Sequence, residues 1–247
     1  MSARVDNILR GFVEDLSETH STNLVSVVLY GSAVGDHVPL QSDYNILVVL
    51  HRIAPADLRL AQSAVRNWQR LGFSLPVYFT LDELRSAADV FPIEFRHMER
   101  ARRVLYGSDP FVGITISDAN LRHQTEYELR SKLIQLRRHY VPASNSAERL
   151  CALMAESFSS VAALLVPALI LSGEKNPPVV KRELVQLAVE RFALDRATFD
   201  ALLELRARTT SDLDLAEAER LFAAYLAQLE RLIAAVDSLR ATTGDAT

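Results

Sequence analysis

The sequence predicts an α+β protein in which a small domain with a mixed β-sheet precedes an all-α helical bundle domain. Apolar, β-branched runs are confined to the first part of the chain, at 24–30 (LVSVVLY), 44–50 (YNILVVL) and 75–79 (LPVYF), and they predict strands. From about residue 120 onward, apolar residues recur only at helical spacing. We place the domain boundary near residue 115, after a break at Asp109-Pro110, giving domains 1–115 and 116–247.

Helices complete the first domain. Helical periodicity predicts them at 3–19, 55–71 and 91–105. Between the last two, Thr80 and Glu83 form a T-x-x-E capping box, which predicts the start of a further helix and gives Glu83 a structural role. The second strand is apolar on both faces, so it is either central in the sheet or covered by helices on one side only.

The second domain is predicted to contain helices alone. The first of them ends before Pro142. The segment 147–172 is apolar nearly all round, which indicates the buried centre of a bundle. Asp195 and Asp214 are well placed as N-caps of the last two helices. The predicted helices after that centre span 179–192, 196–208 and 215–239.

Composition and charge narrow the functional classes. The net charge is −4, and each domain has two more acidic than basic residues, which argues against a general nucleic-acid binder. Cys151 is the only cysteine, so we expect no intramolecular disulfide and a reducing compartment. The N-terminus lacks the pattern of a signal peptide, and the apolar run 161–171 is too short to span a bilayer. We expect a cytoplasmic protein without a membrane partner.

The most informative stretch is 29–50, LYGSAVGDHVPLQSDYNILVVL. A strand runs into a Gly31-Ser32 turn, ten residues follow, and Asp43-x-Asn45 opens the second strand. A turn that exposes backbone N–H groups, followed by acidic or amide side chains at a strand start, suits phosphate and metal binding. This stretch resembles the signature of the nucleotidyltransferases of the DNA polymerase beta superfamily, and the two-domain organisation is similar to that of its antibiotic adenylyltransferases.

The resemblance implies a nucleoside triphosphate as substrate or ligand, with Mg²⁺ or Mn²⁺. Gly31, Ser32 and Ser42 would bind the nucleotide, while Asp43, the candidate catalytic residue, would hold the metal together with Asn45. Two metals about 3.5–4 Å apart are typical of this chemistry. The family pattern has three metal carboxylates, whereas here Asn45 is uncharged and 75–79 contains no acid. The sequence therefore predicts impaired or altered metal dependence.

Two functional hypotheses follow. The first is transfer of a nucleoside monophosphate to a hydroxyl group of a small molecule or a protein; the alternative is a catalytically inactive module that binds nucleotide or a protein partner. The acceptor, the preferred base and the oligomeric state stay open. Two groups of charged residues have open roles. Arg100, Arg102 and Arg103 either contact a polyphosphate or form a solvated helix face, and Glu126, Glu128 and Glu156 are either candidate general bases or surface residues.

Overall fold

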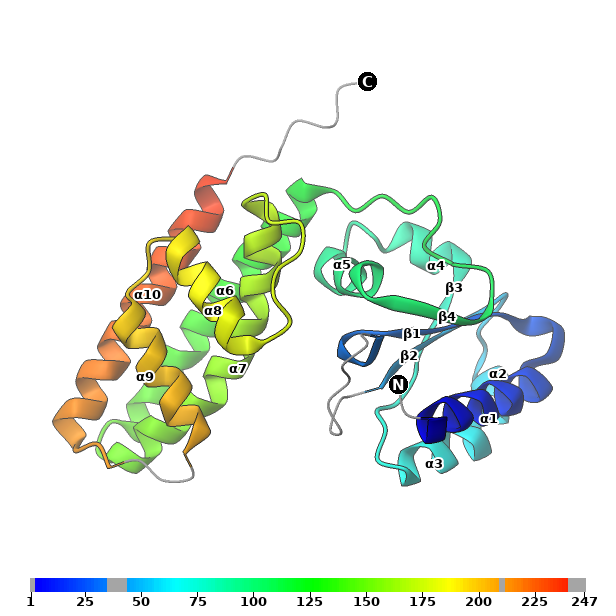
Figure 1. Ribbon diagram of the computed structural model, residues 1–247, viewed down its shortest axis with the longest axis horizontal. Coiled ribbons are helices and arrows are strands. Elements are labelled where there is room, and N and C mark those ends of the chain that lie inside the picture. Colours follow the sequence, from blue (N-terminus) through cyan, green and yellow to red (C-terminus); the bar gives the residue numbers. More distant parts are fainter. Residues whose placement is uncertain (1–2, 35–43, 209–211, 240–247) are drawn as a thin grey trace, which may run out of the picture. The chain divides into compact units, whose positions relative to one another are not determined.

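The chain folds as two compact units, Met1–Ile116 and Ser117–Thr247. The computed structural model describes residues 3–34, 44–208 and 212–239. The first unit is built on a four-stranded mixed sheet and the second on helices, so the predicted α+β class is confirmed. Figure 1 shows the elements of each unit.

The first unit places its strands in the order β3-β2-β1-β4. Strand β1 pairs antiparallel with β2 and with β4, whereas β2 pairs parallel with β3. The second strand is thus central, one of the two arrangements left open by its sequence. The elements are α1 (Ala3–His20), β1 (Leu24–Tyr30), η2 (Ser32–Val34), β2 (Asn45–Leu50), α2 (Pro55–Leu60), α3 (Gln62–Arg70), β3 (Val77–Thr80), α4 (Leu81–Ser86), α5 (Pro92–Arg100) and β4 (Arg102–Gly107).

The predicted helix over 91–105 is wrong in its second half. Helix α5 ends at Arg100, and the chain continues as strand β4. Without β4, the backbone groups on that side of β1 would lack ladder partners, and buried amides and carbonyls require such partners. The pairing of Tyr30 with Arg102 closes this edge. Tertiary pairing therefore overrides a helical pattern that continues through the basic residues.

Three other predicted bounds differ from the structure. The helix predicted over 55–71 is divided at Ala61 into α2 and α3. The strand predicted over 75–79 begins only after Pro76, and β3 lies at an edge of the sheet. Helix α6 continues through Pro142 to Ala143, because a proline one residue from the helix end removes only one late hydrogen bond.

Each face of the sheet carries its own apolar core. On one face, α1, α2 and α3 cover inward side chains of β1 and β2, with Phe12 stacked on Trp68 at a ring distance of 4.5 Å. On the other face, α4 and α5 cover a second set that includes Leu47 and Phe95. Figure 1 shows these two layers of helices on opposite sides of the strands. Because both faces are covered, polar chemistry is confined to strand ends.

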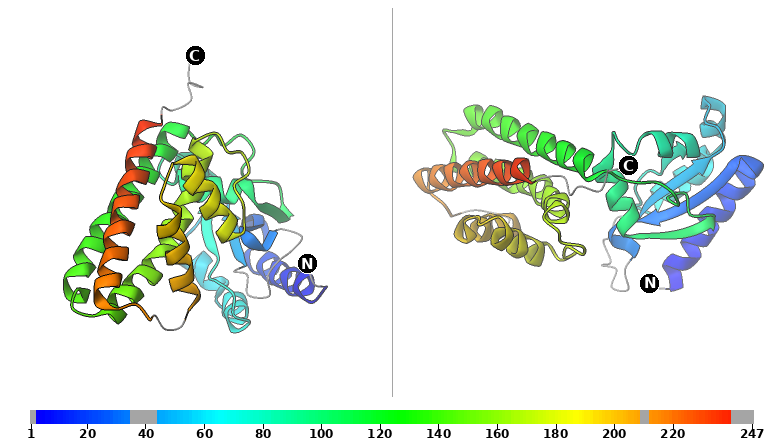
Figure 2. Two further views of the ribbon diagram at one scale, coloured as in Figure 1. Left: turned by 60° about the vertical axis from the view of Figure 1, so that its left-hand side comes forward. Right: turned by 90° about the horizontal axis from the view of Figure 1, so that it is seen from above.

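The second unit is helical throughout its described residues. Helix α7 is its centre, since α6, α8, α9 and α10 all pack against it, and Figure 2 shows α10 running beside α6. Phe158 of α7 is fully buried and contacts Phe199 and Tyr225 with ring distances of 6.1 and 6.3 Å. The elements are α6 (Asp118–Ala143), α7 (Ala147–Leu171), α8 (Lys181–Arg191), α9 (Arg196–Ala207) and α10 (Leu215–Ser238).

Helix α7 is also the one described helix that is long and apolar enough, by length and composition, to cross a membrane. Half of its most apolar window is buried inside the structure, and the core helix of a soluble protein meets the same criterion. Its apolar surface is thus accounted for in large part by packing within the bundle.

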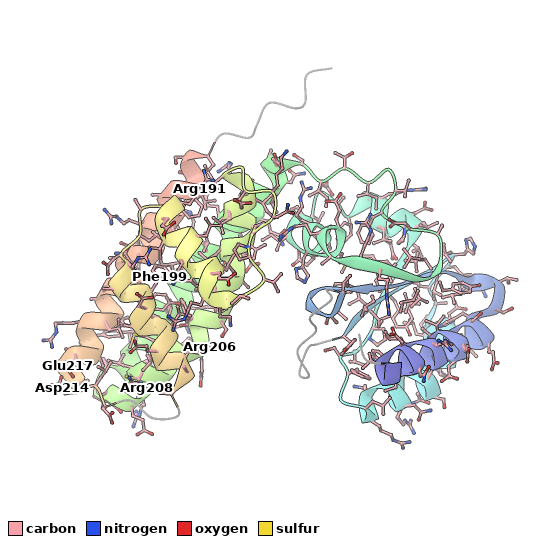
Figure 3. The ribbon with its side chains drawn as sticks, in the orientation of Figure 1. Arg191, Phe199, Arg206, Arg208, Asp214 and Glu217 are labelled. Atoms are coloured by element: carbon pink, nitrogen blue, oxygen red, sulfur yellow. The ribbon has the colours of Figure 1, made fainter. Side chains whose placement is uncertain are left out.

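The predicted helix caps are confirmed. Asp195 accepts a hydrogen bond from the Thr198 amide at 2.9 Å, and Asp214 accepts one from the Glu217 amide at 2.8 Å. Glu217 in return accepts from the Asp214 amide at 3.0 Å, which completes a capping box. Figure 3 labels Asp214 and Glu217 at this helix start. These side chains satisfy amides that an isolated helix leaves without acceptors.

Candidate nucleotide-binding turn

The turn after β1 is held by backbone hydrogen bonds on both sides. Gly31 has φ of +86°, a conformation that side chains disfavour. Its N–H donates to the carbonyl of Ala101 at 2.8 Å, and its carbonyl accepts from the Val34 amide at 3.1 Å. The Gly31 amide is therefore engaged within the protein, unlike the exposed N–H expected from the sequence.

Two side-chain nitrogens converge on the Cα of Gly31. A Cβ added to this glycine would lie 3.2 Å from Nδ2 of Asn45 and 3.2 Å from Nε2 of His97. Asn45 opens β2 and pairs with Tyr30 of β1, whereas His97 comes from α5 on the covering layer. The missing side chain of Gly31 thus leaves room for polar groups from two elements that lie far apart in sequence.

His97 is the site residue that sequence reasoning missed. Its ring is exposed but lies edge-on to Tyr30, with the ring centres 6.3 Å apart. Desolvation by the surrounding protein, followed by the positive charge of Arg100, lowers the pKa of the imidazole. Burial likewise raises the pKa of the Tyr30 hydroxyl. A lone histidine in a helical pattern gives no sequence signal for this placement, because it depends on how α5 packs on the sheet.

The structure places the predicted site residues unequally. Gly31 and Asn45 are brought together, and the backbone of Ser32 begins the short helix η2. The side chain of Ser32, and both Ser42 and Asp43, lie outside the described residues. The roles assigned to these three side chains stay predictions.

Strand β3, where the sequence predicts a third metal carboxylate, contains no acidic residue. It begins at Val77, opposite Leu47 of β2, and Leu75 precedes it in the chain. Leu75 is 60% exposed. Two acidic residues follow β3 directly in the chain. Glu83 accepts a hydrogen bond from the Thr80 amide at 2.7 Å in the predicted capping box. The Asp82 side chain is 99% exposed to solvent.

The described side chains beside Gly31 lack the ligands that a divalent metal requires. Mg²⁺ favours oxygen ligands and is held by carboxylates. Within residues 3–34, 44–208 and 212–239, no three His, Cys, Asp or Glu side chains form a metal-binding group. At Gly31 the described side chains offer an amide and an imidazole. This set does not fit a Mg²⁺ site, and the predicted Mg²⁺ or Mn²⁺ binding through Asp43 and Asn45 stays a prediction.

The basic cluster after α5 has mainly structural contacts. Arg102 donates from Nη2 to Asp109 at 2.8 Å and lies over the ring of Phe111. Arg103 pairs with Asp6 of α1 at 3.1 Å. Because both guanidinium groups are committed to partners within the unit, the structure favours neither the polyphosphate contact nor the solvated helix face for Arg102 and Arg103.

The candidate general bases lie on the helical unit. Glu126 pairs with Arg130 at 2.7 Å and with Arg122 at 3.2 Å. The hydrogen bond from Arg130 is the largest of the causes that lower the pKa of the Glu126 carboxyl, and a lowered pKa makes it a weaker base. Glu128 is half-buried and Glu156 is exposed. Nothing in their surroundings marks either as a base.

No protein-family model and no curated protein sequence matches the chain. Among solved structures, it is similar to the spectinomycin adenyltransferase AAD(9) from Enterococcus faecialis, crystallised with ATP and spectinomycin. The TM-score is 0.44 at 12% sequence identity, over 91% of this chain and 98% of that chain. The likeness is one of fold.

Proposed function

We propose that the chain binds a nucleoside triphosphate at the turn between β1 and β2 and transfers its nucleoside monophosphate to a hydroxyl group of a small molecule or protein. The observation that carries the binding step is the convergence of Asn45 and His97 on Gly31, in a turn that only glycine adopts without strain. Side-chain nitrogens beside bare backbone are suited to phosphate oxygens.

The remaining roles belong to the proposal and derive from the sequence motif. Ser32 and Ser42 would contact phosphate oxygens, and Asp43, the one carboxylate of the motif, is the candidate catalytic residue. A carboxylate near the phosphates serves transfer either by holding a metal or by orienting the attacking hydroxyl group. The described donors beside Gly31, an amide and an imidazole, do not fit a divalent metal.

A second candidate function is nucleotide binding without transfer. It is favoured by the lack of carboxylates where the family pattern has them: Asn45 stands at one such position, and β3 contains no acid. Without negative charge at these positions, two divalent cations would be held mainly by the nucleotide itself. Such a chain would sense nucleotide or serve as an interaction module.

Pyrophosphate release distinguishes the two functions. The protein is incubated with each nucleoside triphosphate, with Mg²⁺ or Mn²⁺, and with small hydroxyl compounds and proteins as acceptors. Transfer is supported if Asp43→Ala abolishes the release of pyrophosphate and Asp82→Ala leaves it unchanged. Asp82 is the matched control because its carboxylate is solvated. Nucleotide binding without any release supports the binding module and argues against transfer.

A further inference from the structure

The charges around Gly31 are those of an anion site. Asn45 contributes an uncharged amide, and the charged group that acts on the His97 ring is the guanidinium of Arg100. Strand β3, which pairs with β2, contains no acidic residue. In a cation site these positions would carry carboxylates, because divalent cations bind hard, charged oxygens. The described side chains instead present nitrogen donors and positive charge.

The side-chain nitrogens of Asn45 and His97 can also donate to a ligand. Within the described residues, the side chains of Asn45 and His97 have no hydrogen-bond or ion-pair partner; His97 has only its ring contact with Tyr30. His97 is exposed and Asn45 is half-buried, so a ligand can replace the water at both side chains. An oxyanion at this point would accept from both nitrogens at once. An imidazole with one N–H donates in its neutral form as well as in its charged form.

We infer that Asn45 and His97 form a phosphate-binding site that holds the polyphosphate of a nucleotide directly, without a bridging divalent metal. The inference rests on the proposed nucleotide binding at the Gly31 turn and assigns its chemistry. The two nitrogens donate to oxygens of one phosphoryl group beside Gly31, whose lack of a side chain lets both of them approach the turn. These hydrogen bonds take the place of the contacts that metal ions supply elsewhere to a triphosphate.

The test is equilibrium binding of ATP and of inorganic tripolyphosphate, each measured by calorimetry in EDTA, with ATP in Mg²⁺ as a third arm. Both ligands should bind in EDTA. His97→Ala should weaken that binding about tenfold or more, the loss expected for a hydrogen bond to a charged group, and His97→Gln should recover part of it. His51→Gln, at another exposed histidine of the same unit, should have no effect.

Asn45→Asp separates an anion site from a cation site. A carboxylate here would repel phosphate, so ATP binding in EDTA should weaken about tenfold or more. In a metal site the same change would add a ligand and tighten ATP binding in Mg²⁺. The urea midpoint of each variant, measured alongside, shows that the first unit is folded when its affinity is compared.

The outcomes distinguish this inference from the proposed function. If ATP binds only with Mg²⁺ and Asn45→Asp tightens it, the inference fails while nucleotide binding stands. If His97→Ala binds ATP in EDTA as His51→Gln does, the inference also fails. If tripolyphosphate binds in EDTA but ATP does not, the anion site stands and the proposed function fails. If no arm shows binding, both are overturned.

Discussion

Gly31 shows how one small residue organises the candidate site. Its φ of +86° needs the freedom of glycine, and its bare Cα leaves space that the side chains of Asn45 and His97 approach. The turn needs both the positive φ and the bare Cα. A residue with a side chain that tolerated this φ would still crowd the side chains of Asn45 and His97. The same position therefore sets the shape of the turn and lets the two side chains approach it.

Gly31→Ala should destabilise the first unit by about 1–3 kcal/mol, the cost of a side chain in a disfavoured backbone region, and should weaken ATP binding. Urea unfolding and calorimetry measure the two effects. The control is Gly11→Ala, at a helical position with no atom within 4 Å of an added Cβ; alanine there should stabilise by roughly 0.5–1 kcal/mol. Equal stability of the two variants would contradict the role of Gly31.

His20 is a buried residue whose protonation opposes folding. Neither ring nitrogen has a hydrogen-bond partner among the described residues. Desolvation lowers the pKa of the imidazole, and the nearby charge of Asp57 offsets this only in part. Tyr78 lies edge-on to the ring at 6.4 Å, and burial raises the pKa of its hydroxyl to about 12. The folded unit thus holds His20 neutral.

The free energy of unfolding of the first unit should accordingly decrease as the pH is lowered. A lowered folded pKa means that the unfolded chain binds the proton first, so the stabilisation is complete above the unfolded pKa of about 6.5 and is lost as pH falls below it. His20→Gln should reduce this loss, measured as urea midpoints from pH 7.5 to 5.0, whereas the exposed His51→Gln should not. His97 contributes in the same window, so some pH dependence remains in the variant.

At the scale of elements, the passage from β3 into α4 joins two structures through one residue. Thr80 is the last residue of β3, opposite Leu50, and also the N-cap of α4. Its hydroxyl accepts from the Glu83 amide at 3.1 Å while its own amide donates to the Glu83 carboxylate. Glu83 is thereby committed to capping, which removes the nearest acid from a metal site.

Thr80→Ala should lower the free energy of unfolding of the first unit by about 1 kcal/mol, the typical loss of an N-cap. Thr80→Ser should restore most of it, because serine supplies the same acceptor.

Glu83→Gln should leave the affinity for divalent metal unchanged when Mn²⁺ binding is titrated, because the Glu83 carboxylate serves the helix cap. Weaker Mn²⁺ binding in Glu83→Gln would show that this carboxylate faces a metal and not only the helix start.

At the scale of the whole molecule, the chain has separate hydrophobic cores. The first unit packs α1, α2 and α3 on one face of the sheet and α4 and α5 on the other, while the second unit is centred on α7. Trp68, the only tryptophan, belongs to the first unit and is 1% exposed. Its fluorescence therefore reports on the sheet unit, whereas far-UV circular dichroism is dominated by helices of both units.

Because each unit has its own core, we expect separate unfolding transitions. Phe158→Ala in α7 should destabilise the helical unit by about 3–5 kcal/mol and shift the circular dichroism transition without moving the Trp68 fluorescence transition. Leu16→Ala in α1, fully buried in the first unit, should shift the fluorescence transition. If both probes moved together in both variants, the two units would unfold as one.

The sequence by itself determined the features that depend on neighbouring residues. Apolar β-branched runs specify β1 and β2, the spacing of Thr80 and Glu83 specifies a capping box, and Asp195 and Asp214 specify helix starts. Each of these rests on contacts within a few positions along the chain, and such contacts leave a pattern in the residues.

Only the tertiary structure decided what depends on distant segments. Strand β4 exists because β1 has an edge to pair, although its own residues continue a helical pattern. His97 reaches Gly31 because α5 packs on the sheet, and β3 lies beside β2 because the two strands pair in parallel. The motif predicts a nucleotide-binding turn, but the side chains around that turn are set by long-range packing, which no local spacing encodes.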